Sequence, residues 1–401
     1  MAVLVIGLIF GGLVGYVATP KGVPQDQFNT LQAQNTALES QVTQLQIQVD
    51  QLEGKANKTE TINLAHSPSI GQYFTDIDGF ALYYFAKDTP GTGISTANSQ
   101  TLTKWAPFYV SPIVAAMGIN MIDFSIITGP TGSPQLAYKG WPLYKFLNDK
   151  NPGETNGEGF ADLWWVMKPN YTLMLSYTNA LGLHFSTIND EGIYYFAGDI
   201  PSSNSSNIAG NLAYPFKPFF EASINVPSTV DTLLFSTITG QNGTRQVAYR
   251  GWPLYSCIQD VNPGDVFGDS YNIYNETTVL PLWFLMKYNY NLMIAFNDFQ
   301  GVYLTDGMGR TLYYNVNDQE SMPIYMNTQF WTPYNSTPTV APNALPLDST
   351  KLFTRSDGLS QVEYLTYPLY YYVGDAKPGD MKGNSLMGEW FIINPFSYLY
   401  G

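Results

Sequence analysis

A ten-residue segment recurs three times in this chain and limits what the chain can fold into. Its copies occupy residues 135–144 (QLAYKGWPLY), 246–255 (QVAYRGWPLY) and 361–370 (QVEYLTYPLY), and the last copy has lost the Gly-Trp pair. The copies lie roughly 110 residues apart, which is the length of a domain rather than of a solenoid unit. The sequence therefore predicts one module used three times, each copy large enough to bury its own core.

Each predicted module has two halves that share a Tyr-x-aromatic-x-x-Asp motif. The first-half copies are at 83–88, 194–199 and 313–318, and the second-half copies at 144–149, 255–260 and 370–375. Alternation at period 2 places the Tyr and the aromatic residue on one strand face, with the Asp in the following turn. Asn315 and Cys257 replace the aromatic residue in two copies. Each motif therefore predicts a strand followed by a turn.

The predicted fold class is all-β. Short strands and Gly/Pro turns fill the chain after residue 54, and no long segment there has a helical period. We expect three tandem β-rich repeat domains, sandwich- or meander-like, at residues 67–178, 179–298 and 299–401.

The first residues of the chain predict a membrane anchor. Residues 2–18 carry no charge, and a segment of that length is at the short end of what spans a bilayer. We assign residues 1–20 to a transmembrane helix, and the alternative is a signal peptide that is cleaved. The prediction is a single-pass cell-membrane protein with the bulk of the chain outside the cell.

A heptad pattern follows and predicts a coiled coil over residues 25–54. Four successive leucines hold one core position, and β-branched valines share the other with a lone asparagine, a pattern typical of coiled coils. The two sets are Leu31, Leu38, Leu45 and Leu52, and Phe28, Asn35, Val42 and Val49. We expect a dimer or trimer. A single amphipathic helix packed on a domain is the alternative.

The composition excludes one class of partner and favours an unusual environment. The net charge is −14, so the chain offers no basic surface to nucleic acid. Charged residues make up only 12% of the chain, and a surface sparse in charge suits an acidic exterior, where carboxylates are protonated. Six sequons favour an exported glycoprotein; they are Asn57, Asn170, Asn204, Asn242, Asn275 and Asn335.

The residues that could carry chemistry are few. Cys257 is the only cysteine, and His66 and His184 have no equivalents in the other repeats. Phosphate loops, Ser-His-Asp signatures and zinc motifs are missing from the sequence. We therefore expect no catalytic residue, no cofactor and no metal, and we expect that the chain is not an enzyme.

Two weaker candidates for ligand binding remain. Trp141 and Trp252 could stack on sugars, although tryptophans on a strand face more often pack a core. The acidic loop with Asp260, Asp265 and Asp269 could hold Ca²⁺, although it is not an EF-hand loop and such aspartates more often accept hydrogen bonds in turns.

The ordered set of motifs resembles a known family. The Tyr-x-aromatic-x-x-Asp motif, the Pro-Leu-Tyr strand and the following Pro-Gly resemble the secreted repeat of predicted bacterial and archaeal lipoproteins, over roughly residues 70–401. The function of that family is unknown, so the resemblance implies an exported β-module and no reaction. Two features depart from the family: this chain has no Cys pair before the Trp-x-Pro segment and no lipobox Cys.

These patterns together predict a structural role. We expect a membrane-anchored, extracytoplasmic assembly protein, such as a stalk, filament, surface-layer or membrane-complex component. Its expected partners are the membrane, further copies of itself through the coiled coil, and other envelope proteins. The alternative is an extracellular ligand- or glycan-binding module that uses aromatic faces and aspartate turns.

Overall fold

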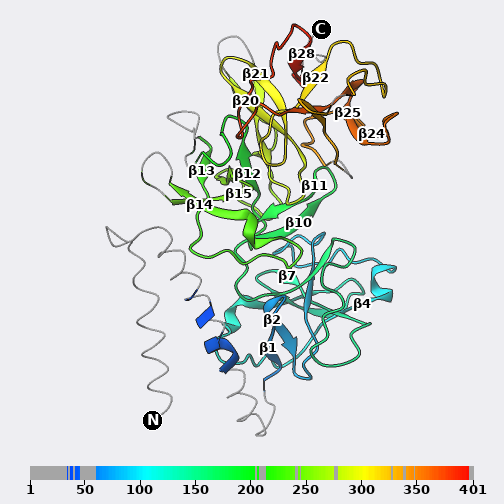
Figure 1. The fold of residues 1–401 in the computed structure, drawn as a ribbon. Helices are drawn as coiled ribbons and strands as arrows, with labels where there is room; N and C mark the ends of the chain where they lie inside the picture. The colour runs from blue at the N-terminus through cyan, green and yellow to red at the C-terminus, as the bar shows by residue number, and fades with distance from the viewer. Residues whose placement is uncertain are drawn as a thin grey trace. The chain divides into compact units, whose positions relative to one another are not determined.

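The computed structural model describes residues 34, 37–38, 41–45, 60–203, 206, 214–239, 243, 245–274, 279–326, 328–336, 340–346 and 348–396 (Figure 1). The predicted anchor at 1–20 and most of the predicted coiled coil at 25–54 lie outside these residues. Within the described residues, no helix is both long enough and apolar enough to cross a membrane. Residues 41–45 are helical. The chain divides into two compact units, residues 1–59 and 60–401, and the second unit holds all three repeats.

The second unit is built almost entirely of short antiparallel strands, which confirms the all-β class and the three repeats. In the first repeat the strands are β1 (Ile62–Ser67), β2 (Gly71–Asp76), β3 (Tyr83–Phe85), β4 (Trp105–Pro107), β5 (Phe124–Thr128), β6 (Pro134–Tyr138), β7 (Trp141–Pro142), β8 (Tyr144–Phe146) and β9 (Trp164–Val166).

The third repeat follows the same order of strands, and the second adds one strand, β18. The second has β10 (Met174–Thr178), β11 (Gly182–Ser186), β12 (Ile193–Phe196), β13 (Phe216–Pro218), β14 (Phe235–Thr239), β15 (Arg245–Tyr249), β16 (Trp252–Pro253), β17 (Tyr255–Cys257), β18 (Tyr271–Tyr274) and β19 (Val279–Leu285). The third has β20 (Leu292–Asn297), β21 (Gly301–Asp306), β22 (Tyr313–Asn315), β23 (Trp331–Pro333), β24 (Thr350–Thr354), β25 (Ser360–Tyr364), β26 (Tyr367–Pro368), β27 (Tyr370–Tyr372) and β28 (Trp390–Ile392). Short 3₁₀ turns precede three strands: η1 (Thr101–Thr103), η2 (Met121–Asp123) and η4 (Thr232–Leu234).

Each repeat contains a hairpin, a central sheet and a three-stranded sheet. In the first repeat these are β1-β2, β4-β8-β3-β9 and β5-β6-β7. The central sheets of the other repeats are β13-β17-β12-β19-β18 and β23-β27-β22-β28. The two motif strands are always neighbouring inner strands of the central sheet, so the most repeated residues of the sequence lie inside it.

The register of the inner strands relates the two halves of a repeat by an approximate two-fold axis. Tyr83 of β3 lies opposite Tyr144 of β8. The outer strands follow the same symmetry, because β4 pairs Trp105 with Phe146 and β9 pairs Trp164 with Phe85. The other repeats have the same opposed pairs, Tyr194 with Tyr255 and Tyr313 with Tyr370. The internal symmetry seen in the sequence is therefore an antiparallel pairing of half-motifs.

The hairpins join one repeat to the next. The Tyr177 N–H of β10 donates to the Ala86 carbonyl of the first repeat at 2.8 Å. The Phe185 N–H of β11 donates to the Met286 carbonyl of its own repeat at 2.9 Å. The domain boundaries expected at 178/179 and 298/299 lie in the turns of β10-β11 and β20-β21. One buried hydrophobic cluster runs through all three repeats, so neighbouring repeats share a core.

Candidate functional site

The two tryptophans considered as sugar platforms are buried in the core. Trp141 and Trp252 have no exposed surface. Each packs edge to face against a tyrosine of the inner strand, Trp141 on Tyr84 and Trp252 on Tyr195. The Trp141 Nε1–H also donates to the Ile188 carbonyl of the next repeat at 2.8 Å. Neither ring has a free face for a ligand.

The three aspartates of the acidic loop are engaged in separate hydrogen bonds. Asp260 accepts from the Tyr194 hydroxyl at 2.6 Å, and Asp269 accepts from the Leu285 N–H at 2.8 Å. Asp265 accepts from the N–H groups of Val261 and Asn262 within its own turn. Across the described residues, no group of three His, Cys, Asp or Glu side chains could hold a metal ion. Each of the three carboxylates accepts hydrogen bonds within the fold.

The strongest polar feature of the repeat is a crossed pair of tyrosine–aspartate hydrogen bonds. In the first repeat, the Tyr83 hydroxyl donates to Asp149 Oδ2 at 2.7 Å. The Tyr144 hydroxyl donates to Asp88 Oδ2 at 2.6 Å. Each motif tyrosine therefore binds the aspartate of the other half.

The crossed pair recurs in both other repeats. The bonds run from Tyr194 to Asp260 at 2.6 Å, Tyr255 to Asp199 at 2.7 Å, Tyr313 to Asp375 at 2.6 Å and Tyr370 to Asp318 at 2.7 Å. In most copies the second carboxylate oxygen accepts a backbone N–H of the turn that follows, from Thr96, Asn156, Phe267, Ile324 and Lys382. Both carboxylate oxygens are thereby used within the fold.

The pairs lie in a low-dielectric environment that shifts their protonation. Burial raises the pKa of Asp88 to about 6, although the Tyr144 hydroxyl and the Thr96 N–H favour its charged form. Burial likewise raises the pKa of Asp260 to about 6 against the bonds from Tyr194 and Phe267. Burial and the charge of Asp88 raise the pKa of Tyr144, so the tyrosine keeps its proton. The pair is therefore a donor and an acceptor that satisfy each other inside the fold.

Stacked aromatic rings cover the crossed pairs. Trp105 of β4 and Trp164 of β9 stack with ring centroids 3.8 Å apart and planes 5° from parallel. The same stack is Phe216 on Trp283 at 3.6 Å in the second repeat and Trp331 on Trp390 at 3.8 Å in the third. These residues belong to the two strands that flank the motif strands, so their rings meet across the motif pair.

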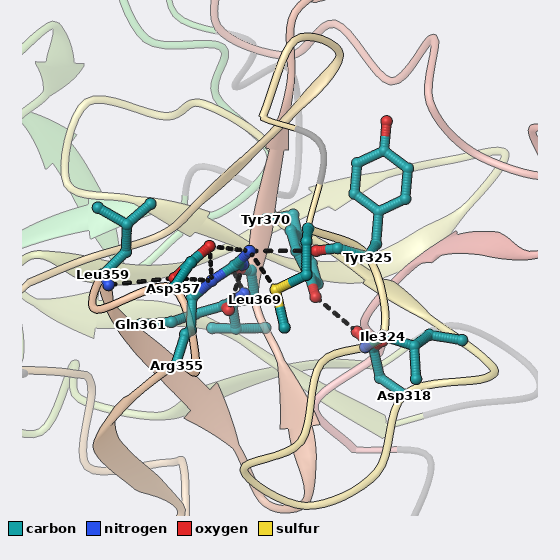
Figure 2. A network of polar contacts seen from close by, with 10 residues as sticks. Asp318, Ile324, Tyr325, Arg355, Asp357, Leu359, Gln361, Leu369 and Tyr370 are labelled. Atoms are coloured by element: carbon teal, nitrogen blue, oxygen red, sulfur yellow. Dashed lines mark hydrogen bonds and ion pairs between the residues drawn. The ribbon is translucent and has the colours of Figure 1, made fainter.

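The third repeat adds a buried cation beside its pair (Figure 2). The Arg355 guanidinium donates to Gln361 Oε1 at 2.9 Å, to the Tyr325 carbonyl at 3.2 Å and to Asp357. Gln361 begins the repeated ten-residue segment, and its Nε2–H bonds the Leu369 carbonyl. In the other repeats, Gln135 and Gln246 donate in the same way, but their buried Oε1 atoms have no partner among the described residues.

Two buried lysines at the junctions between repeats were not singled out as site residues by the sequence. The Lys168 ammonium donates to the Val226 carbonyl of the next repeat at 2.8 Å, and burial lowers its pKa to about 8. The Lys287 ammonium donates to Asn343 Oδ1 at 2.7 Å, and burial also lowers its pKa. A Met-Lys pair follows the aromatic strand in both repeats. This recurrence is the sequence feature that could have identified the two lysines. Both lysines help to hold successive repeats together.

The remaining single residues are structural or lie on the surface. Cys257 is buried, and His184 is buried with its Nδ1 2.9 Å from the Gly182 carbonyl, while His66 is half-buried. Of the sequons, Asn170 and Asn335 are exposed. The other four sequons lie outside the described residues: Asn57, Asn204, Asn242 and Asn275.

Two hollows are open on the described surface. One of about 260 Å³ lies where the first two repeats meet and is lined by Lys139, Glu191 and Asn262 among others. The other, of about 420 Å³, lies on the third repeat and is lined by Tyr314, Tyr367 and Phe391 among others. The crossed pairs line neither hollow, so the repeated motif and the open surface are separate features.

Comparison with known proteins agrees with this architecture. Searches of the curated proteins and of the solved structures found no match. A family profile described as a secreted repeat of unknown function matches at residues 125–168, 236–275 and 351–394. Each match covers the second half of one repeat, from the first strand of the three-stranded sheet to a point beyond the second motif strand, and the description of a secreted repeat implies a location outside the cell. Three segments of the chain, one in each structural repeat, therefore match a secreted repeat of unknown function.

Proposed function

We propose that this protein is a structural component of the cell exterior, in which three interlocked β-repeats are displayed by an N-terminal anchor and a coiled-coil stalk. The observation that carries the proposal is the crossed pairing: all six motif aspartates accept a bond from a motif tyrosine of the same repeat. The most repeated polar groups of the chain thus stabilise the fold, and a repeated unit of this kind suits a spacer or assembly component.

The stalk proposal is supported by the part of residues 25–54 that the structure describes. Residues 41–45 are helical, and Leu38 and Leu45 lie one heptad apart. Both leucines are exposed in the single chain, at 57% and 60%. Leucines at this spacing gain most by packing against another helix, which favours a dimer or trimer.

An acidic exterior is supported by the buried carboxylates. Burial raises the pKa of Asp190 to about 7, in addition to the values near 6 for Asp88 and Asp260. A carboxylate with a raised pKa is protonated in mild acid without loss of the fold. The core is therefore suited to a medium below neutral pH.

The proposed role involves no reaction and no cofactor. A general acid or base needs an ionisable group within reach of a substrate, and the motif aspartates are closed off by their tyrosines and turns. A glycan-binding role remains the alternative, and it would have to use surfaces other than Trp141 and Trp252, whose rings are buried. Glycan binding by the intact protein would therefore favour loops over the repeated motif.

Chemical crosslinking of the full-length protein in membranes tests the stalk. We expect dimers or trimers, and we expect the double variant L38D/L45D to remain monomeric at low protein concentration, because charge at a core position disrupts the seam. The matched control is L233D/L359D, which changes two exposed leucines of the β-repeats. A monomeric wild-type chain, or equal crosslinking of both double variants, would exclude a coiled-coil assembly.

A further inference from the structure

A buried amide oxygen of the first repeat differs from its counterpart in the third repeat in what it contacts. Gln135 and Gln361 have no exposed surface, and their Nε2–H groups donate to the Leu143 and Leu369 carbonyls at 2.9 and 2.8 Å. This bond fixes the amide, so the oxygen of each glutamine is turned away from that carbonyl. Gln361 Oε1 accepts a bond from the Arg355 guanidinium at 2.9 Å (Figure 2). Gln135 Oε1 accepts none from the residues that the structure describes.

Gly129 holds the position of Arg355 in the first repeat. The Gly129 N–H donates to the Ser133 carbonyl at 2.7 Å, and the Arg355 N–H donates to the Leu359 carbonyl at 2.8 Å, so the two hairpin loops close in the same way. A Cβ built on Gly129 would lie 3.2 Å from Gln135 Oε1. The side chain that satisfies the glutamine in the third repeat therefore starts at a position where the first repeat has no side chain.

Three further oxygen-bearing side chains surround the Gln135 amide. The Tyr144 hydroxyl donates to Asp88 at 2.6 Å, and the Ser95 hydroxyl bonds the Tyr144 hydroxyl. Burial and the charge of Asp88 raise the pKa of Tyr144, while Ser95 and Gln135 lower it, so both of these side chains lie beside the phenol oxygen. The cluster of Asp88, Ser95, Gln135 and Tyr144 is rich in oxygen atoms, and we call it the oxygen cluster.

The hydroxyl protons of the oxygen cluster are already in use. Tyr144 has a single hydroxyl proton and donates it to Asp88, so Ser95 donates its own proton to the Tyr144 oxygen. Neither hydroxyl can then donate to Gln135 Oε1. A buried acceptor without a donor is costly. In the third repeat the guanidinium, which is a cation and only donates, removes this cost.

The oxygen cluster also carries a buried negative charge without a cation. Both carboxylate oxygens of Asp88 accept bonds, Oδ2 from Tyr144 and Oδ1 from the Thr96 N–H and hydroxyl. Among the described residues, no Lys, Arg or His forms an ion pair with Asp88. In the third repeat, burial raises the pKa of the equivalent Asp318, and the charge of Arg355 acts in the opposite direction. A positive charge beside the crossed pair is therefore compatible with this fold.

The second repeat has the same cluster as the first. The Gln246 Nε2–H donates to the Leu254 carbonyl at 2.8 Å, and Gln246 Oε1 has no partner among the described residues. Burial and the charge of Asp199 raise the pKa of Tyr255, while Gln246 and Ser206 lower it, as Gln135 and Ser95 do for Tyr144. The two repeats that have a serine beside the motif tyrosine are thus the two whose glutamine oxygen is unsatisfied.

We propose that the first and second repeats each bind a small monovalent cation, Na⁺ or K⁺, at the position that the Arg355 guanidinium takes in the third repeat. Amide, hydroxyl and carboxylate oxygens are the ligands that such hard cations prefer. The cluster supplies one carboxylate, whereas Ca²⁺ takes six to eight oxygen ligands and commonly several carboxylates. Ser95 is half-buried, which gives the ion a route from solvent. The inference does not depend on the anchor or on the stalk.

Anomalous scattering from Tl⁺, which replaces K⁺, locates the ion in crystals of the full chain. We expect one Tl⁺ beside Gln135 and one beside Gln246, and none beside Gln361, whose oxygen is bonded to Arg355. Gln135→Leu removes the amide oxygen and should abolish the first peak alone. The peak beside Gln246 then shows that the variant is folded and that the soak succeeded.

Thermal unfolding of the full chain tests the same site in solution. The midpoint should rise with the logarithm of the NaCl or KCl concentration, because a cation that binds only the folded chain stabilises it. Choline chloride at equal concentration supplies a cation too large for the site and should give no such rise. Gly129→Arg places the third-repeat side chain in the first repeat and should reduce the slope to about half, since one of two sites is lost. The matched control Gly129→Ala adds the Cβ without the charge and should keep the full slope.

Three outcomes would overturn the inference. The first is a water molecule, and no Tl⁺, beside Gln135. The second is a midpoint that rises equally in choline chloride, which would mean that ionic strength alone acts. The third is an equal loss of slope in Gly129→Ala and Gly129→Arg, which would attribute the effect to the backbone of the loop and not to the charge.

Discussion

Tyr83 and Tyr144 lie directly opposite each other on β3 and β8, and each donates its hydroxyl to the aspartate five residues after the other. The bond lengths are 2.7 Å to Asp149 and 2.6 Å to Asp88. This exchange explains why the spacing from tyrosine to aspartate is the same in both half-motifs: an approximate two-fold axis between the strands makes the two bonds equivalent. It also joins two turns that are distant in sequence across the centre of the sheet.

Tyr144→Phe should lower the free energy of unfolding by about 1.5–3 kcal/mol, the usual range for a hydrogen bond to a charged group. The ring stays, and the hydroxyl that donates to the buried Asp88 and also bonds the Ser95 hydroxyl is lost. Urea denaturation measures the change, with Tyr109→Phe at a 44% exposed position as the control. Equal stability of the two variants would show that the pair contributes nothing.

The tyrosine and the aspartate that share one of these hydrogen bonds should also be energetically coupled. A double-mutant cycle of Tyr83→Phe and Asp149→Asn should give a coupling energy within about 0.5–3 kcal/mol, as for residues in direct contact. The cycle of Tyr83→Phe with Asp318→Asn, a motif aspartate of the third repeat, should be additive. Additivity of both cycles would contradict a specific pair.

The stacked rings allow a test in which one repeat supplies the control for another. Trp105→Phe reproduces the Phe216–Trp283 stack of the second repeat and should cost little. Trp105→Ala opens a cavity beside Trp164 and should cost about 3–5 kcal/mol. Thermal denaturation of both variants measures the difference. A similar loss for both would mean that the stack is not interchangeable between repeats.

Gly157 is needed because its Cα faces the stack. A Cβ there would lie 2.6 Å from Trp105 Cη2 and 2.9 Å from Tyr83 Cε1. Gly157→Ala should therefore cost about 1–3 kcal/mol through overpacking. Gly132→Ala is the comparison, since it has φ +82° and no atom within 4 Å, so it carries backbone strain alone. If Gly132→Ala lowers the free energy of unfolding by more than Gly157→Ala does, the predicted clash is contradicted.

Stability should rise as the pH falls from about 7 to about 4. Asp88, Asp190 and Asp260 have folded-state pKa values raised to about 6, 7 and 6, against about 3.9 for an unfolded aspartate. Between these values the folded chain binds more protons than the unfolded chain, so acid favours folding. Unfolding free energies at pH 7, 5.5 and 4 measure the trend, and a steady decrease would contradict it.

His184 opposes this trend and supplies an internal check. Burial lowers its pKa to about 4, so the unfolded chain takes up a proton near pH 6.5 that the folded chain does not. The stability that the neutral, buried His184 contributes is present above about pH 6.5 and is lost as the pH falls toward 4. Tyr73 and Tyr303 hold the equivalent position in the other hairpins, so His184→Tyr should steepen the gain in acid. An unchanged slope would mean that His184 does not titrate in this range.

The sequence predicted the local features of the repeat well. Alternating Tyr and aromatic residues predicted β3 and β8, and the motif aspartates were placed in the turns that follow, where the carboxylates of Asp88 and Asp149 bind backbone N–H groups. Strand and turn preferences act over a few residues, so they are visible in the sequence itself.

The pairing of one motif with the other could not be predicted from a local sequence pattern. Tyr83 and Asp149 are 66 residues apart, and nothing within either motif states that each tyrosine binds the aspartate of the other half. The roles of Lys168 and Lys287 were missed for the same reason, because their acceptors belong to the next repeat. Such partners depend on which strand edges meet, and that is decided by packing over the whole repeat.

The amino-acid order thus fixes the number of repeats, their strands and turns, and the aromatic content of their cores. Folding decides what those residues contact: it buries Trp141 and Trp252 and crosses the Tyr–Asp bonds. The physical reason is that hydrogen-bond preference and hydrophobicity are properties of single residues. A crossed pair of hydrogen bonds or a shared core, in contrast, exists only when distant segments of the chain converge.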